Sequence, residues 1–257
     1  SGRKKGIARL FIFNLFTKGN QSMNIALSYR SGTEHSFLYE KWLGTFSTVT
    51  FIAMNEVPVE EYQSVLRTCS GIVFTGGADV HPGLYGADNR LTECTIEPER
   101  DDKETILRDL SLELQIPILA ICRGEQFFAI KHGGSLVVDI PTDIHQSMIH
   151  GKIEGKDSFH SITIEPRSLL HKLTKVDEAI VNSAHHQSIN NVPADFIASS
   201  FAPDGVIESI EWADTTGKPF FLGVQWHPER MDYSSSCSSS IAQHFMMEAE
   251  SYSLLLR

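Results

Sequence analysis

The 257-residue chain has few cysteines and no long apolar run, and each shortage excludes a class of protein. The four cysteines are too scattered for a disulfide framework, and none forms the CxxC pair typical of zinc sites. They are Cys69, Cys94, Cys122 and Cys237. This usage favours a reducing, cytoplasmic compartment. No apolar stretch approaches the roughly 18 residues that span a bilayer, so we expect no membrane partner.

The chain also has fewer basic than acidic residues. The chain carries 22 Lys and Arg against 32 Asp and Glu, a net charge of −10. Such a charge repels a phosphate backbone, so we expect no nucleic-acid partner. A content of 41% hydrophobic and 21% charged residues is that of an ordinary globular protein. These exclusions leave a small-molecule ligand as the default expectation.

The first 22 residues differ in character from the rest. Residues 1–22 join a basic start to an apolar run at 7–16, as a secretory signal does, but they lack a small-residue cleavage site. A strand pattern begins at Met23. We therefore interpret 1–22 as an N-terminal extension or an expression-vector remnant, and 23–257 as the functional domain. A terminal segment docked on that domain is the alternative.

From Met23 onward, short apolar runs alternate with helical patterns, which is typical of βαβ units and a mainly parallel sheet. The patterns predict strands at 25–29, 48–54, 71–75 and 117–121, and helices at 35–43, 59–67 and 99–114. After Asp139, shorter strands at 161–165, 179–183, 206–212 and 220–225 indicate an antiparallel extension. We expect the serine-rich segment 234–240 to be a surface connection before a last helix at 241–255.

Cys122 is the candidate nucleophile. It follows the apolar strand 117–121, precedes a helical pattern and lies between the small residues Ala120 and Gly124. This is the cysteine counterpart of the G-x-S-x-G elbow, whose strained turn needs small neighbours. A helix N-terminus stabilises a thiolate and turns the backbone N–H of Arg123 toward a developing oxyanion. The other three cysteines lack this context and are expected to be small buried hydrophobes.

A base and its orienting group follow the strand 220–225. His227 and Glu229 are two residues apart in an extended segment, so their side chains project to one side and Glu229 can hold the imidazole. A His-Pro-Glu triplet alone is more often a surface turn. With the elbow it completes a Cys, His and carboxylate set. The paired glycines after strand 71–75 indicate a second oxyanion donor at the backbone N–H of Gly77.

These residues lie in motifs, spread over 23–245, that resemble class I glutamine amidotransferases. They resemble more closely the peptidase C26 family, which includes γ-glutamyl-γ-aminobutyrate hydrolase. The motifs are GGADVHPGLYG (76–86), ERDDKETILRDL (99–110), IPILAICRGEQ (116–126), HGGSLVVDI (132–140), FHSITIEPRSLL (159–170), VNSAHHQSIN (181–190) and LGVQWHPE (222–229). The resemblance implies a flavodoxin-like α/β three-layer sandwich with a mainly parallel sheet and a small antiparallel extension.

The resemblance also implies an activity and a site. A Cys122 thioester would form during cleavage of the γ-glutamyl amide of a small metabolite, and glutamate and an amine would be released. His227 and Glu229 would complete the triad, and Gly77 and Arg123 would hold the oxyanion. The substrate side would be lined by Gly76, Gln126, His185, His186 and Gln187. The family implies no cofactor and no metal, and a homo-oligomer stays open.

Several alternatives stay open at this stage. His185 and His186 could contact substrate, lie on a plain polar loop or bind metal, although a metal needs further ligands, and His160 is expected to be structural. The chain could instead be a glutaminase module that delivers ammonia to a partner synthase. It could also be a non-catalytic descendant in which Cys122 senses redox state or the pocket only binds a ligand. The acidic net charge favours a cationic leaving group over folyl-polyglutamate.

Three residues depart from the family pattern. Ala120 replaces a usual glycine, Glu125 a usual hydrophobic residue and Ala129 a usual asparagine. The Glu125 carboxylate would either repel a thiolate at Cys122 or face solvent without effect. Our hypothesis is that Glu125 changes which amine part of the substrate fits.

Overall fold

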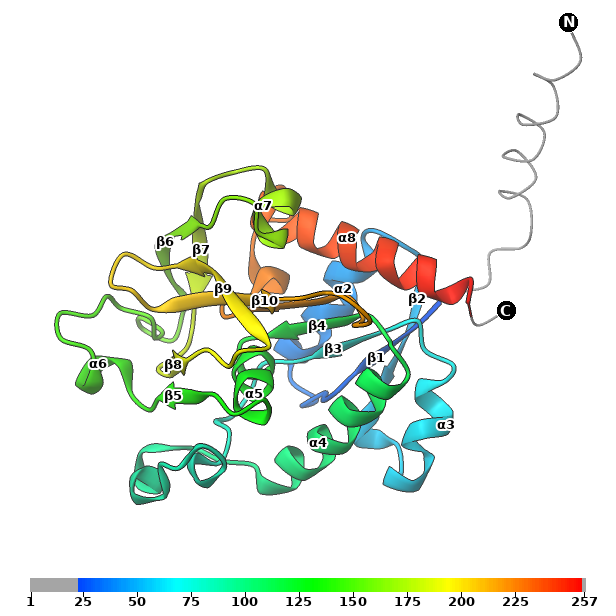
Figure 1. Ribbon diagram of the computed structural model, residues 1–257, viewed down its shortest axis with the longest axis horizontal. Coiled ribbons are helices and arrows are strands. Elements are labelled where there is room, and N and C mark those ends of the chain that lie inside the picture. Colours follow the sequence, from blue (N-terminus) through cyan, green and yellow to red (C-terminus); the bar gives the residue numbers. More distant parts are fainter. Residues whose placement is uncertain (1–22, 256–257) are drawn as a thin grey trace, which may run out of the picture.

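A computed structural model describes residues 23–255, so the predicted extension at 1–22 lies outside the described residues. A nine-stranded sheet with the order β2-β1-β3-β4-β11-β10-β9-β6-β7 runs through the molecule (Figure 1). Helices cover both faces of its parallel part. Within residues 23–255, no helix combines the length and apolarity needed to cross a bilayer.

Five neighbouring strands form the parallel part of the sheet. They are β1 (Met23–Leu27), β2 (Val49–Ala53), β3 (Gly71–Phe74), β4 (Ile118–Ile121) and β11 (Phe221–Val224). Every residue of β3, β4 and β11 is buried, as expected for strands covered on both faces. Val224 of β11 is paired with Ile121 of β4, so both strands end at the same edge of the sheet.

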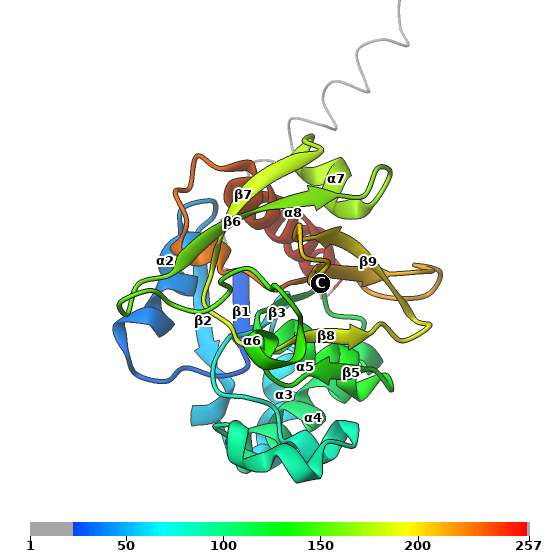
Figure 2. The same cartoon turned by 90° about the vertical axis from the view of Figure 1, so that its left-hand side faces the viewer.

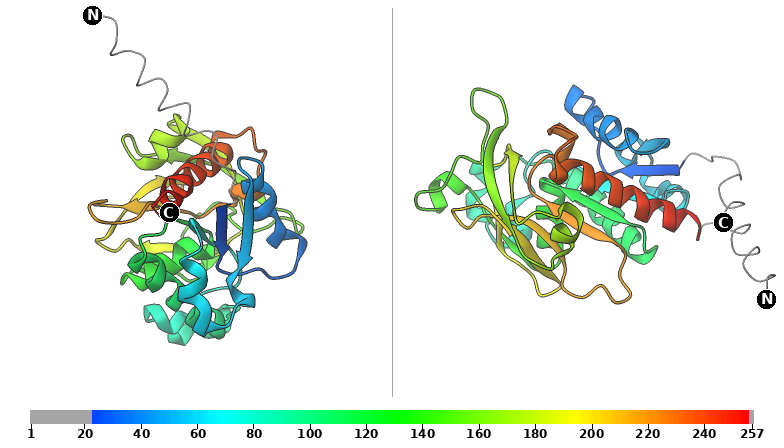
Figure 3. Two further views of the ribbon diagram at one scale, coloured as in Figure 1. Left: turned by 90° about the vertical axis from the view of Figure 1, so that its right-hand side faces the viewer. Right: turned by 90° about the horizontal axis from the view of Figure 1, so that it is seen from above.

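Two helical layers pack on this part of the sheet. On one face lie α2 (Leu38–Gly44) and α8 (Ser236–Ser253), and on the other α3 (Tyr62–Leu66), α4 (Pro98–Glu113) and α5 (Arg123–Lys131). Along β4, Leu119 packs in the core that contains α8, and Ala120 in the core that contains α5. Figure 3 shows α8 lying along its face of the sheet. The predicted α/β three-layer architecture is therefore confirmed.

The antiparallel extension continues the same sheet. It consists of β10 (Ile207–Trp212), β9 (Phe196–Phe201), β6 (Ser158–Ile164) and β7 (Glu178–Ser183). A separate antiparallel pair is formed by β5 (Ser135–Val137) and β8 (Ser188–Asn191). Figure 2 looks onto this end of the molecule. The strands predicted after Asp139 correspond to β6, β7, β10 and β11, whereas β8 and β9 were not predicted. The assignment of 220–225 to the antiparallel extension is wrong, because β11 pairs in parallel with β4.

Short helices complete the described chain. Two are α6 (Ile140–Asp143) and α7 (Leu169–Thr174). The 3-10 helices are η1 (Glu34–Phe37), η2 (Met54–Glu56), η3 (Val59–Glu61), η4 (Pro82–Tyr85), η5 (Asp88–Glu93) and η6 (Pro228–Arg230). The predicted helices at 35–43 and 59–67 therefore each begin as a 3-10 turn.

The structure of the serine-rich segment 234–240 differs from the prediction. It is not a surface connection, because α8 already begins at Ser236, and Cys237 and Ser238 are fully buried. The indole N–H of Trp42 donates to Ser238 Oγ at 3.0 Å, and that of Trp226 donates to the carbonyl of Cys237 at 3.0 Å. Small side chains allow this first turn to pack closely beneath two tryptophans.

Candidate active site

Cys122 occupies a strained turn between β4 and α5. Its φ of +52° and ψ of −107° are rare for a residue other than glycine, and such outliers cluster at functional sites. Its N–H donates to the carbonyl of Val224 at 2.7 Å, which anchors the turn to β11. A Cβ on Gly124 would overlap the carbonyl of Phe74, so only glycine lets α5 approach β3 this closely. The predicted strand–turn–helix around Cys122 is therefore present.

His227 and Glu229 form a buried pair just after β11. Nδ1 of His227 lies 2.8 Å from Oε1 of Glu229, and the His227 backbone N–H donates to Asn182 Oδ1 at 3.1 Å. Burial lowers the pKa of His227, but the Glu229 carboxylate and the Cys122 sulfur raise it to about 9. The ring is therefore cationic at neutral pH.

Gly76 packs closely against both His227 and Cys122. A Cβ built on Gly76 would lie 2.7 Å from Cε1 of His227 and 3.5 Å from Cβ of Cys122. The Gly76 backbone therefore fills the space beside both residues, and its N–H donates to the Tyr39 hydroxyl at 3.0 Å. Burial raises the pKa of Tyr39 well above its usual range, so the phenol is neutral. No larger residue fits at position 76 without moving the triad.

The two predicted oxyanion donors, Gly77 and Arg123, directly follow Gly76 and Cys122 along the chain. Arg123 is the first residue of α5, so no carbonyl within the helix can accept its N–H. Gly77 packs directly on the guanidinium of Arg100, and any Cβ there would overlap it. Arg100 in turn donates to the carbonyls of Thr75 at 2.9 Å and Gly76 at 3.0 Å, which fixes the glycine loop.

A buried ion network beneath the elbow was missed by the sequence analysis. The Arg123 side chain bonds to Asp101 and Glu104 of α4, and Arg100 Nε donates to Glu104 at 3.0 Å. Ser28 Oγ also donates to Glu104, at 2.7 Å. The four charged residues are nearly inaccessible and their charges balance. The available signal was the spacing of 100, 101 and 104, which places three charges on one buried helix face.

The predicted substrate residues separate into two groups. Gly76 lies against the triad, whereas the other polar side chains are engaged within the protein. Gln126 Nε2 donates to the Gln187 carbonyl at 3.0 Å, and Gln187 Nε2 donates to the Val138 carbonyl at 3.1 Å. Nδ1 of His185 lies 2.9 Å from the Gln187 carbonyl, and its other nitrogen faces Glu208.

His186 differs from His185 in exposure and partners. Its side chain is 38% exposed, and its two ring nitrogens lie 3.1 Å from Asp79 and 3.1 Å from Asp139. The hydrogen bond to Asp79 raises the pKa of His186, burial opposes it, and the net value is about 9. This histidine therefore bridges two loops as a cation.

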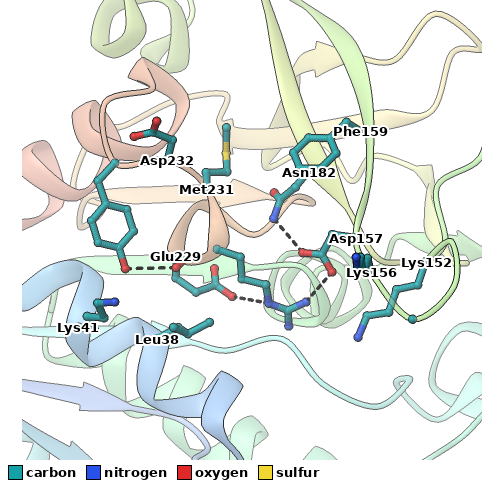
Figure 4. A pocket seen from close by; sticks show the side chains of 13 residues that line it. Leu38, Lys41, Lys152, Lys156, Asp157, Phe159, Asn182, Glu229, Met231 and Asp232 are labelled. Atoms are coloured by element: carbon teal, nitrogen blue, oxygen red, sulfur yellow. Dashed lines mark hydrogen bonds and ion pairs between the residues drawn. The ribbon is translucent and has the colours of Figure 1, made fainter.

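Arg230 lines two cavities, and Glu229 lines only the larger of them. The smaller, of about 280 Å³, is lined among others by Tyr39, Gly76, Gly77 and Arg100. The larger, of about 750 Å³, is lined by Leu38, Lys41, Lys152, Gly155, Lys156, Asp157, Phe159, Asn182, Glu229, Arg230, Met231, Asp232 and Tyr233 (Figure 4). Arg230 lies 3.4 Å from Glu229 and 3.2 Å from Asp157. The cavity wall thus holds the Glu229 side chain in place.

Glu125 does not face solvent, so that alternative is wrong. Its side chain is fully buried, and its Cγ lies 2.9 Å from where a Cβ on Gly223 would be. Burial, with the nearby charges of Glu208 and Cys122, raises the pKa of Glu125 well above its usual range. A neutral carboxyl group does not repel the nucleophile. Ala129 is also fully buried, within the core that contains α5.

The other cysteines are free. Cys69 and Cys237 are fully buried, and burial raises their pKa values to about 12 and about 11, as expected for inert hydrophobes. Cys94 is only partly buried, so the prediction of a buried hydrophobe is wrong there. Its Sγ accepts a hydrogen bond from Gln187 at 3.4 Å.

The sequence is similar to a known family and to several known proteins. The family model described as Peptidase C26 matches residues 18–229. Protein NtpR of Enterococcus hirae is 34% identical over 179 residues, which cover 69% of this chain and 74% of the relative. A γ-glutamyl-γ-aminobutyrate hydrolase of Escherichia coli O157:H7 is 33% identical over 174 residues, 65% of this chain and 66% of the relative.

Solved structures with low identity share the fold. A protein from Thermoplasma acidophilum, described as a putative GMP synthase subunit, superposes with a TM-score of 0.63 at 19% identity, covering 92% of this chain and 98% of that one. The glutaminase domain of Trypanosoma brucei CTPS, with bound acivicin, gives a TM-score of 0.61 at 15% identity, covering 90% and 94%.

Proposed function

Because the chain belongs to the peptidase C26 family, we propose that it is a hydrolase that cleaves the γ-glutamyl amide bond of small metabolites through a thioester on Cys122. The observation that carries the proposal is the strained Cys122 elbow beside a His227 ring that Glu229 holds at 2.8 Å. A relative named for γ-glutamyl-γ-aminobutyrate hydrolysis supports this substrate class.

The acylation half of the reaction follows from the roles of these groups. The Cys122 sulfur attacks the γ-carbonyl carbon, and the resulting oxyanion accepts hydrogen bonds from the backbone N–H groups of Gly77 and Arg123. Each oxyanion donor is typically worth about 10²- to 10³-fold in rate. His227 then gives its proton to the leaving amine as the C–N bond breaks, a transfer worth about 10²- to 10⁴-fold. The products are a free amine and a γ-glutamyl thioester.

The second half regenerates the enzyme. Neutral His227 takes a proton from water, whose oxygen attacks the thioester carbonyl, and the C–S bond breaks. Glutamate leaves, and the thiolate and the imidazolium are restored. Glu229 orients the ring throughout and stabilises its cationic form.

The predicted substrate residues act in different ways in this proposal. Gly76 borders the reacting atoms, and the partly exposed His186 contributes to the substrate side. Gln126, His185 and Gln187 shape that side through hydrogen bonds within the protein, because Gln126 Nε2 and His185 Nδ1 both bond to the Gln187 carbonyl and Gln187 Nε2 donates to the Val138 carbonyl.

Glutamate release from a panel of γ-glutamyl amides tests the proposal. The panel includes glutamine, γ-glutamyl-4-aminobutyrate and a folyl-diglutamate, each assayed with the wild-type protein and with Cys122→Ala. We expect release from at least one small amide and its loss in the variant. Release that persists in Cys122→Ala would overturn the nucleophile. If a folded protein releases no glutamate from any amide in the panel, a partner-dependent glutaminase or a ligand-binding role would be favoured.

A further inference from the structure

Three histidines and a glutamate that the proposed reaction does not use converge behind the active site. They are His150, His160, His185 and Glu208, and none is more than 5% exposed. Nδ1 of His150 and Nε2 of His160 each lie 3.3 Å from Oε1 of Glu208, and Nε2 of His185 lies 3.6 Å from it. The four donor atoms all lie within 4.8 Å of one another.

The outer nitrogen of each ring fixes which nitrogen carries the proton. Nδ1 of His160 lies 3.1 Å from the Ser161 carbonyl, and Nδ1 of His185 lies 2.9 Å from the Gln187 carbonyl. A carbonyl only accepts, so these nitrogens are the donors. Nε2 of His150 likewise lies 2.9 Å from the Asp204 carboxylate. In the neutral form of each ring, the lone pair therefore points at Glu208.

Lone pairs and a carboxylate cannot satisfy one another. All three inner nitrogens and both Glu208 oxygens are buried and have no hydrogen-bond partner among the described residues. Buried polar groups are otherwise almost always paired. A carboxylate oxygen and three imidazole lone pairs that face one another at 3.3–3.6 Å repel unless positive charge lies between them.

We propose that these four side chains bind one divalent transition-metal ion of the zinc class. Zinc takes histidine nitrogen and carboxylate oxygen at about 2.0–2.2 Å in tetrahedral geometry. The edge of such a tetrahedron is about 3.3–3.6 Å. The three nitrogen–oxygen separations are 3.3, 3.3 and 3.6 Å, and all four donors lie within 4.8 Å, so the nitrogens need only move closer together around the ion. With neutral rings, the charges of Glu208 and the neighbouring Asp204 balance a divalent cation.

The donor set differs from what the sequence analysis expected. It predicted no metal and weighed His185 with its neighbour His186, but His186 belongs to another pair of contacts. Four protein ligands close the coordination shell, which is typical of structural rather than catalytic sites. Hydrogen bonds from the outer ring nitrogens to carbonyls or a carboxylate are also typical of metal-bound histidines.

The position of the cluster indicates which strands and loops the ion would stabilise. The Glu208 carbonyl accepts the Gln225 N–H at 2.9 Å, two residues before His227. The Gln187 carbonyl accepts from both His185 and Gln126, and Gln126 belongs to the elbow helix α5. The ion would therefore tie β6, β10 and the loops at 150 and 185 to the rear wall of the site. It takes no step in the hydrolysis.

Metal content is the first test. The full chain, produced without a polyhistidine tag and exchanged into metal-free buffer, is analysed by inductively coupled plasma mass spectrometry. We expect about one zinc-class ion per chain. Removal with a chelator should lower Tm, and added Zn²⁺ should restore it. Substitution with Co²⁺ should give the visible absorption bands of a tetrahedral site.

Three variants locate the ion. Glu208→Gln should abolish stoichiometric binding, and Asp204→Asn should weaken binding about 10- to 100-fold by removing the support of one ligand. His244→Gln is the matched control, because His244 lies on α8 and contacts Glu248 at 3.3 Å, outside the cluster. It should retain the ion.

Two results would overturn the proposal. One is a wild-type chain that carries no metal, gains no Tm with Zn²⁺ and shows no tetrahedral Co²⁺ spectrum. The other is a metal that His244→Gln loses as fully as Asp204→Asn does. If Glu208→Gln fails to fold, the wild-type spectrum and Asp204→Asn still decide the question.

Discussion

Gly76 is the residue at which a single methyl group is expected to decide activity. A Cβ there would lie 2.7 Å from Cε1 of His227 and 3.2 Å from the Tyr39 hydroxyl, so the ring must move. We expect Gly76→Ala to lower kcat/KM for a γ-glutamyl amide by about 100-fold, the effect of misplacing a catalytic group by roughly 1 Å. The control is Gly44→Ala, whose Cβ meets nothing within 4 Å. Equal activity of the two variants would contradict the proposed arrangement.

We expect the titration of His227 to contribute to the pH dependence of the free energy of unfolding. Its pKa is raised to about 9 in the folded protein, against an ordinary value of 6.5. A raised pKa stabilises the fold fully below about pH 6.5, and this contribution is lost as the pH rises toward 9. We expect the difference in free energy of unfolding between wild type and His227→Gln to shrink by about 1–3 kcal/mol over that window. Chemical denaturation at several pH values measures it, and a constant difference would refute the assignment.

Glu125 tests whether a buried residue selects the substrate. The side chain lies beneath the elbow against Gly223, so it acts on the amine only through the position of its neighbours. We expect Glu125→Met to change the ranking of γ-glutamyl amides by kcat/KM, because a bulkier apolar side chain shifts the elbow helix. An unchanged ranking would show that Glu125 has no part in selection.

At the scale of the helix, α4 supports the elbow through charge. Glu104 accepts hydrogen bonds from Ser28, Arg100 and Arg123 in a buried network. The variant Glu104→Gln removes this charge and leaves two buried cations partly unpaired. Such a loss typically lowers the free energy of unfolding by about 3–5 kcal/mol. Glu99→Gln makes the same change on the same helix at a side chain that is 94% exposed, where a change below about 1 kcal/mol is expected.

Urea unfolding of these two variants beside the wild type gives the comparison. The expected order of stability is wild type, then Glu99→Gln close behind it, and Glu104→Gln well below both. Similar losses in the two variants would mean that the network contributes no more than a surface ion pair.

Elements were predictable where one local pattern determined them. The buried strands β3 and β4 are continuous apolar runs bounded by turn residues, and the elbow at Cys122 is a local strand–turn–helix signal. The start of α8 was not predictable, because a run of polar serines is typical of a loop. There, burial beneath Trp42 and Trp226 overrides local propensity.

At the scale of the whole molecule, distance along the chain limited the prediction of the site. Glu229 lies two residues from His227, so their pairing could be inferred from spacing. The cluster of His150, His160, His185 and Glu208 spans 58 positions (208 − 150) and comes from two strands, β6 and β10, and two loops, so no motif spacing joins it. Only the antiparallel pairing of β9 with both β6 and β10, together with the loops at 150 and 185, assembles these side chains.

The distribution of charge is a second property of the whole molecule, and it cannot be read from the net charge of the sequence. The net charge of −10 favours a cationic leaving group, yet Lys41, Lys152 and Lys156 line the large cavity beside Glu229 (Figure 4). Arg230 pairs with the carboxylates of Asp157 and Glu229 there. The local potential is therefore more positive than the average, which favours anionic ligands at this cavity.

We expect a γ-glutamyl amide whose amine part bears a carboxylate to show a lower KM than its neutral carboxamide analogue, by about 3- to 10-fold at low salt. The double variant Lys152→Gln/Lys156→Gln should reduce this ratio, whereas Lys175→Gln, at an exposed position outside the cavity lining, should keep it. Added salt should also shrink the ratio, because exposed charges are screened within about 10 Å at 0.1 M. A wild-type protein that instead prefers a cationic amine would show that the field of the whole chain outweighs the three lysines.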